Sequence, residues 1–236
     1  MSAPAILRPP MALPRILPLE QGDHLTRAEF ERRYEMMPHV KKAELIEGVV
    51  HMASAVRFAL HGCPNADLVT WLGVYRAGTP GVRHADNVTI RLDLDNEPQP
   101  DALLLVLPSH GGRATITADD YIADGPELVG EISASTVSND LDEKFRVYRR
   151  NAVQEYIVWR IQDAALDWFV LRNGQYERLQ PDAVGILKSE VFPGLWLDVA
   201  ALTRFDLAAV LQVLQQGLAH PDHEAFVQRL QQNLRP

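Results

Sequence analysis

Two short, almost entirely apolar segments constrain the fold of this chain more than any other feature. The segment PDALLLVL spans residues 100–107, and the segment ELVGEIS spans residues 127–133. Short apolar runs of this kind are typical of central strands that are covered on both faces. We therefore expect a central β-sheet with helices packed against it.

Each of these expected strands carries a carboxylate, Asp101 at the start of the first and Glu131 inside the second. Burying an unpaired carboxylate costs several kcal/mol, so Glu131 needs a fixed partner: an arginine, a lysine or a metal ion. If the two strands are neighbours, both carboxylates project from one face of the sheet and repel each other. Either one of them is then protonated or a cation lies between them, and such hard oxygen ligands suit Mg²⁺ or Mn²⁺.

The rest of the chain mixes helix and strand patterns. The patterns predict helices at 26–37, 65–78 and 141–150, strands at 86–94 and 155–161, hairpins turning at 47–48 and 173–174, and two amphipathic tail helices within 206–232, broken near Pro221. Asn65 is the expected N-cap of the second helix. This order predicts a mixed α/β or α+β domain built on one central sheet.

The expected helix at 141–150 places a lysine beside the sheet. Asp140 and Glu143 have the spacing of a capping box, and Asn151 stands where a helix often ends in the left-handed conformation. Lys144 lies one turn into this helix, which can pack back against the strand of Glu131. A lysine there can orient or help to deprotonate a metal-bound water.

Two more side chains are candidates for the same site. Strand alternation places Ser133 on the face of Glu131, and Glu44 in the first hairpin is a possible fourth charged member. Acidic residues, a metal and a lysine together suit hydrolysis of a phosphodiester, without selecting DNA over RNA. The alternative roles are structural: a turn at Asp101, an arginine pair for Glu131, a solvated position for Lys144 and an ordinary surface salt bridge for Glu44.

Composition narrows the class of protein. The formal net charge of −8, with no run of basic residues, argues against strong non-specific DNA binding. The single cysteine, Cys63, cannot form an internal disulfide, which favours a reducing compartment. No apolar stretch approaches the roughly 20 residues of a membrane span. We therefore expect a cytoplasmic protein without a membrane partner.

Several motifs resemble those of a known family. Pro100-Asp101, Glu131-Ile-Ser133 and Lys144 resemble the PD-(D/E)XK nuclease pattern, with the lysine moved from the strand to a helix. The segments AELIEGVVHM, PDALLLV, LVGEISASTVSNDLDEKFRVYRRNAVQEYIVWRI and SEVFPGLWLD resemble the Uma-two family of restriction-type endonucleases. This resemblance extends over about residues 23–235.

The resemblance implies a restriction-endonuclease-like fold and Mg²⁺- or Mn²⁺-dependent cleavage of DNA. It implies that Asp101 and Glu131 hold the metal, with Glu44 and Lys144 as the other catalytic residues. His61 stands where the family often has a histidine, with no assigned role. We expect a proline-rich arm at 1–22, a nuclease-like domain at 23–205 and a helical appendage of the same domain at 206–236. The acidic net charge and the C-terminal helices favour self-association as a homodimer.

Two alternatives remain open at this stage. One is a catalytically inactive nuclease-fold module that binds a protein or a nucleic acid, and the other is a hydrolase of a small phosphoester. A nuclease needs a basic rim for its substrate, and the candidates for it are Arg57, Arg83, Arg113, Arg146, Arg149 and Arg150.

Overall fold

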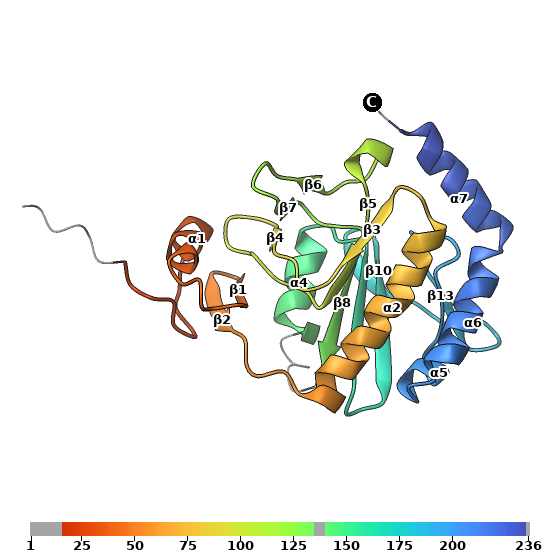
Figure 1. The fold of residues 1–236 in the computed structure, drawn as a ribbon, viewed down its shortest axis with the longest axis horizontal. Coiled ribbons are helices and arrows are strands. Elements are labelled where there is room, and N and C mark those ends of the chain that lie inside the picture. Colours follow the sequence, from red (N-terminus) through yellow and green to blue (C-terminus); the bar gives the residue numbers. More distant parts are fainter. Residues whose placement is uncertain (1–15, 135–139, 235–236) are drawn as a thin grey trace, which may run out of the picture.

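A computed structural model describes residues 16–134 and 140–234 (Figure 1). Its helices are α1 (Arg27–Glu35), the π-helical turn η1 (Phe58–Gly62), α2 (Cys63–Gly78), the 3₁₀ turn η2 (Pro108–His110), α4 (Glu143–Arg150), α5 (Val199–Thr203), α6 (Leu207–Leu218) and α7 (Pro221–Gln232). Its strands are β1 (Ala43–Ile46), β2 (Val49–Met52), β3 (Val82–Ala85), β4 (Ile90–Arg91), β5 (Ala102–Val106), β6 (Thr115–Ile116), β7 (Ile122–Ala123), β8 (Leu128–Ser133), β9 (Glu155–Arg160), β10 (Ala165–Arg172), β11 (Gln175–Arg178), β12 (Ile186–Lys188) and β13 (Trp196–Asp198).

A six-stranded sheet forms the centre of the molecule, in the order β11-β10-β9-β8-β5-β3. Strands β8 and β9 run parallel, whereas the other neighbouring pairs are antiparallel. The two apolar runs are β5 and β8, and every residue in both strands is buried. The predicted mixed sheet with flanking helices is therefore confirmed.

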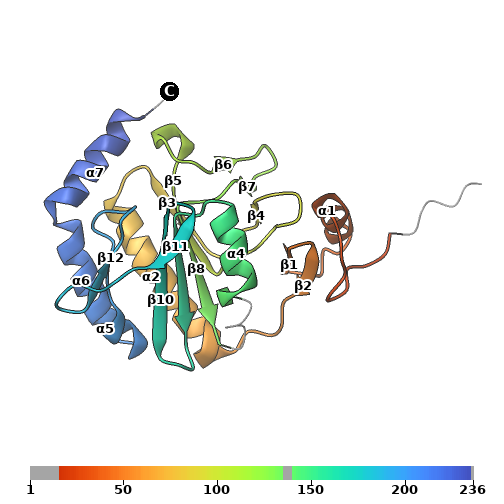
Figure 2. The ribbon, with the colours of Figure 1, turned by 180° about the vertical axis from the view of Figure 1, so that it is seen from behind.

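Alternate residues of the sheet face two separate cores. Leu104 of β5 packs with α2 residues such as Trp71, and the neighbouring Leu103 packs with Tyr148 of α4. Figure 1 shows α2 on one face of the sheet, and Figure 2, from behind, shows α4 on the other. This alternation decides which side chains α4 can meet.

The two C-terminal helices lie beside α2. Val210 and Leu214 of α6 and Phe226 and Leu230 of α7 are buried in the same core as α2. The predicted break near Pro221 is present, since that proline opens α7. Every helix in the described part of the chain is too short or too polar to span a membrane.

The N-terminal lobe, which we define as residues 16–52, has a small core of its own. Leu19, Phe30 of α1 and Leu45 of β1 are buried in it. The β1–β2 hairpin turns at Glu47 and Gly48, whose φ angles of 50° and 76° suit a tight two-residue turn. Figures 1 and 2 show this lobe on the opposite side of the sheet from α6 and α7.

Two local predictions were wrong. The expected strand at 86–94 is reduced to Ile90–Arg91, because the side chain of Asp93 accepts hydrogen bonds from the backbone N–H of Asp95 and from Asn96, which turns the chain. Asn65 is not the cap of α2, because that helix begins at Cys63 and continues directly from η1.

The boundaries of α4 also differ from the prediction. The helix begins at Glu143 with Asp142 as its N-cap, in place of Asp140. Asn151 has a right-handed φ of −90°, and its side chain donates to Asp93 and to the carbonyl of Val147. The left-handed residue is instead Ala152, with a φ of 56°.

Replacing Ala152 by glycine is expected to stabilise the protein. A non-glycine residue in the left-handed region costs about 1–2 kcal/mol, whereas glycine adds about 0.5–1 kcal/mol of chain entropy, so the net gain is about 0.5–1 kcal/mol. Urea unfolding measures this difference. Ala225→Gly is the matched control, because Ala225 is exposed within α7 and its replacement is expected to cost about 1 kcal/mol. Equal destabilisation by both substitutions would contradict the prediction.

Candidate active site

The pairing of β5 with β8 brings two carboxylates together. Ala102 pairs with Gly130 in the antiparallel register, so Asp101 and Glu131 lie next to each other, one residue further along the two strands. The backbone N–H of Ile132 donates to Asp101 Oδ2 at 2.9 Å. Both carboxylates are only 3% exposed. The sequence-based expectation that they share one sheet face is met.

Helix α4 places a buried lysine against these carboxylates. Lys144 Nζ lies 2.9 Å from Glu131 Oε1 and 3.0 Å from Glu44 Oε1. Tyr148, one turn further along α4, donates from its hydroxyl to Glu131 Oε1 at 2.9 Å. The backbone N–H of Gln99 donates to Glu44 Oε1 at 2.7 Å. The buried Glu131 thus has an ammonium group and a phenol as its partners.

Two further basic side chains contact Asp101. His61 Nε2 lies 3.1 Å from Asp101 Oδ2, and Lys42 Nζ lies 3.3 Å from Oδ1 and 2.9 Å from Asn87 Oδ1. Burial raises the pKa of Asp101, but the hydrogen bond from His61, the charge of Lys42 and the backbone N–H of Ile132 outweigh it and hold that pKa at about 2. Asp101 is therefore an anion at neutral pH.

For both Glu131 and Lys144, burial shifts the pKa against the charged form, whereas the opposite charge of the partner shifts it toward the charged form. Burial raises the pKa of Glu131 against the attraction of Lys144, and the nearby carboxylates of Asp101, Asp140 and Glu44 raise it further. Burial lowers the pKa of Lys144, but the charges of Glu131 and Glu44 outweigh it, so this pKa lies well above its ordinary value. Lys144 therefore stays an ammonium ion.

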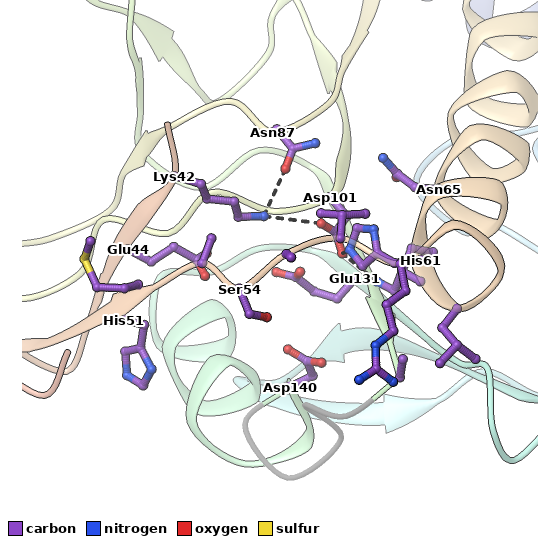
Figure 3. A pocket seen from close by; sticks show the side chains of 18 of the residues that line it. Lys42, Glu44, His51, Ser54, His61, Asn65, Asn87, Asp101, Glu131 and Asp140 are labelled. Carbon is purple, nitrogen blue, oxygen red and sulfur yellow. Dashed lines mark hydrogen bonds and ion pairs between the residues drawn. The ribbon is translucent and has the colours of Figure 1, made fainter. Parts of the chain in front are cut away.

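These side chains line one pocket of about 770 Å³ between the N-terminal lobe and the sheet. Figure 3 shows the carboxylates of Glu44, Glu131 and Asp140 facing a common space, with Lys42 and His61 beside Asp101. Of the six arginines considered for a basic rim, Arg57 lines this pocket. Arg146 and Arg150 instead pair with Glu47.

The structure thus brings together all four predicted catalytic residues, Glu44, Asp101, Glu131 and Lys144. Ser133 does not join them. It is fully buried outside the pocket, and its hydroxyl has no hydrogen-bond partner among the described residues.

Sequence reasoning missed Lys42 and Tyr148 and left His61 without a role. Lys42 lies two residues before Glu44, so the alternation of β1 was a usable signal for it. Tyr148 lies four residues after Lys144, which places both on one face of α4. His61 lies in a π-helical turn, and such turns often mark functional sites.

The carboxylates are not arranged as a finished metal site. Within residues 16–134 and 140–234, no group of three or more His, Cys, Asp or Glu side chains is arranged to hold a metal ion. Lys144 is one reason, because its ammonium group already contacts one carboxylate oxygen of Glu131 and one of Glu44.

The comparisons with known proteins assign the family. The Uma2 family model, described as "Putative restriction endonuclease", matches residues 27–200. This chain belongs to the Uma2 family. The matched range contains Glu44, Asp101, Glu131 and Lys144, and the sequence-based resemblance to this family is confirmed.

A solved structure supports the Uma2 fold. It is the crystal structure of a "putative nuclease belonging to DUF820" from Anabaena variabilis ATCC 29413, with a TM-score of 0.53 and 13% sequence identity. The match covers 73% of this chain and 97% of the Anabaena chain. A likeness at this level of identity shows the fold alone. A comparison with curated proteins finds no match.

Proposed function

We propose that this Uma2 protein is an endonuclease that hydrolyses DNA phosphodiester bonds with the help of Mg²⁺ or Mn²⁺. The observation that carries the proposal is the contact of Lys144 with both Glu131 and Glu44 in the pocket that also contains Asp101. Membership of a family of restriction-type endonucleases supports the same activity. The buried cation and anions have no need to converge in an open pocket for stability alone.

The chemistry of the donor set fits a divalent cation. Mg²⁺ and Mn²⁺ prefer oxygen ligands, and the pocket offers carboxylate oxygens from Asp101, Glu131 and Glu44. Asp101 and Glu131 would hold the ion, with Glu44 assisting directly or through water. When bound, the ion supplies positive charge that polarises the phosphate and makes a nearby water more acidic.

The residues around the carboxylates have separate roles in this proposal. An ammonium group has three N–H donors, and Lys144 uses two of them on Glu131 and Glu44. Its third donor can orient the attacking water and stabilise the charge that develops on the phosphate. Because Lys144 stays charged, it acts as a donor and not as the base. Tyr148 fixes the carboxylate of Glu131.

Lys42 and His61 face the substrate side of Asp101. Both line the pocket, and their nitrogen atoms lie within 3.3 Å of the Asp101 carboxylate. Lys42 places positive charge where a phosphate must approach, which offsets repulsion between the phosphate and the carboxylates. His61 offers a ring nitrogen to the same pocket.

A catalytically inactive nuclease-fold module that binds a protein or a nucleic acid is the second candidate. The observation in its favour is that the three carboxylates already have cationic or hydrogen-bonding partners within the chain. The alternative role predicts binding without cleavage.

Incubation of purified protein with supercoiled plasmid and with a single-stranded oligonucleotide tests the proposal. We expect cleavage in Mg²⁺ or Mn²⁺ and none in excess EDTA, because the carboxylates alone cannot supply the positive charge that the reaction needs. Intact plasmid and oligonucleotide in every metal tested would contradict the proposal and favour the inactive module. Equal cleavage in EDTA would contradict the metal dependence.

A further inference from the structure

An exposed apolar segment borders the pocket. We call residues 53–59 the mouth segment; it leads from the N-terminal lobe into the first two residues of η1, and all of its residues are exposed. Phe58 is 81% exposed and Val56 is 68% exposed. Residues 53–57 of this segment line the pocket. An exposed aromatic side chain next to a pocket offers a flat face on which a ligand ring can stack.

The mouth segment carries a cationic side chain, that of Arg57, which is available for a ligand. Arg57 lies between the two apolar residues in sequence and lines the pocket. In the described ranges, no carboxylate lies within ion-pair distance of Arg57, in contrast to Arg146 and Arg150 on α4. A free guanidinium group suits a phosphate, which accepts two parallel hydrogen bonds from it.

The depth of the carboxylates limits what can reach them. Asp101 and Glu131 are each 3% exposed, so a scissile phosphate must enter the pocket to meet them. The pocket volume of about 770 Å³ is that of a site for a small ligand, about 300–1,000 Å³. A few nucleotides of one flexible strand fit such a volume. A base-paired duplex is stiff and cannot bend one phosphate inward without distortion.

We propose that the mouth segment binds an unpaired strand of DNA, with a base stacked on Phe58 and the adjacent phosphate held by Arg57. Aromatic stacking and a basic groove are the two features with which proteins hold single strands without sequence preference. This proposal rests on the proposed nuclease function and specifies its substrate. Two apolar side chains separated by an arginine offer far less area than a stable protein interface requires.

The experiment measures binding by fluorescence anisotropy in EDTA, where cleavage cannot interfere. The probes are a labelled single-stranded oligonucleotide, the same strand in a duplex, and a strand with abasic sites at its centre. We expect the unmodified single strand to bind about tenfold more tightly than either of the other probes, the contribution of one stacked base. Phe58→Ala is expected to lose this factor on the unmodified strand and almost nothing on the abasic strand.

Two further variants serve as a conservative replacement of Phe58 and as a surface control. Phe58→Trp is expected to retain the preference for the unmodified strand, because tryptophan also stacks. Val184→Ala is the control, because Val184 is likewise 81% exposed and lies outside the pocket, and it is expected to leave affinity within twofold. Equal affinity for duplex and single strand, or no effect of Phe58→Ala, would overturn the proposal. A change of oligomeric state in Phe58→Ala without a change in DNA affinity would also overturn it.

The failure of this proposal is distinguishable from failure of the nuclease. If Phe58→Ala cleaves duplex DNA at the same rate as the unmodified protein, the proposed nuclease function stands and the proposed role of the mouth segment is wrong. If single-stranded DNA binds in a manner that depends on Phe58 but is not cleaved in any metal, the proposed role of the mouth segment stands. The protein is then an inactive nuclease-fold module.

Discussion

Asp101→Asn is expected to lower the rate of metal-dependent DNA cleavage by about 10²–10³-fold, the range seen when one charge-stabilising group is lost from an active site. The substitution removes the negative charge that would hold the metal. It keeps a carbonyl oxygen in the place of Oδ2, which can still accept the hydrogen bond from the N–H of Ile132. The pairing of β5 with β8 is therefore expected to survive. Single-turnover cleavage measures the loss, and circular dichroism reports the fold.

Asp120→Asn is the matched control for this prediction. Asp120 is exposed, lies outside the pocket and has a φ of 66°, a conformation that asparagine tolerates as well as aspartate. Its replacement is expected to leave the cleavage rate within twofold. Comparable rates for Asp101→Asn and the unmodified protein would show that the cleaving residue lies elsewhere, or that a contaminant cleaves the DNA.

Lys144→Met is expected to have the second large effect, on stability as well as activity. It removes a buried ammonium group from between Glu131 and Glu44 while keeping most of the side-chain volume. Leaving a buried charge without its partner costs about 3–5 kcal/mol. Urea unfolding in EDTA measures this cost. Cleavage is expected to fall by about 10²–10³-fold, because the donor aimed at the phosphate is lost.

The pH dependence of the stability lost in Lys144→Met shows whether an unpaired buried carboxylate causes that loss. Without Lys144, the buried Glu131 of the folded protein binds a proton more tightly than it does in the unfolded chain, because burial raises its pKa and the attraction of the ammonium group is gone. A carboxyl whose folded-state pKa is raised loses stability as the pH rises through that pKa. The destabilisation of Lys144→Met is therefore expected to be greater at pH 8 than at pH 5.

A surface lysine provides the control for this second prediction. Lys188 pairs with Asp182 and is 42% exposed, so Lys188→Met is expected to cost about 1 kcal/mol or less. Added Mn²⁺ is expected to restore part of the stability of Lys144→Met, since a second cation can replace the lost charge. A loss of stability no larger than that of Lys188→Met would mean that the ammonium does not hold the carboxylates together.

The sequence predicts structure best where a single physical requirement, such as the burial of an apolar segment, decides the outcome. The apolar runs of β5 and β8 have no alternative to burial, so the central sheet followed from them. Glu131 inside such a run required a partner, and the helical spacing after it provided Lys144. Glu44 in the first hairpin was a possible fourth member from its charge alone, and the resemblance to a family then supported this placement.

The remaining features depend on contacts between distant segments. Asn151 adopts a right-handed conformation because its amide bonds Asp93, which lies 58 residues away in sequence. The expected strand near Ile90 is cut short by the turn that Asp93 and Asn96 form. The bond between Lys42 and Asp101 joins residues 59 apart in sequence. Local propensity carries no information about such partners.

Titration of Mn²⁺ into the protein by calorimetry tests whether Asp101 and Glu131 hold a metal ion, and it requires no substrate. We expect one saturable site in the unmodified protein and in Asp120→Asn, and its loss in Asp101→Asn. Mn²⁺ binding that is unchanged in Asp101→Asn, or absent from the unmodified protein, would contradict the claim that these carboxylates hold a metal ion.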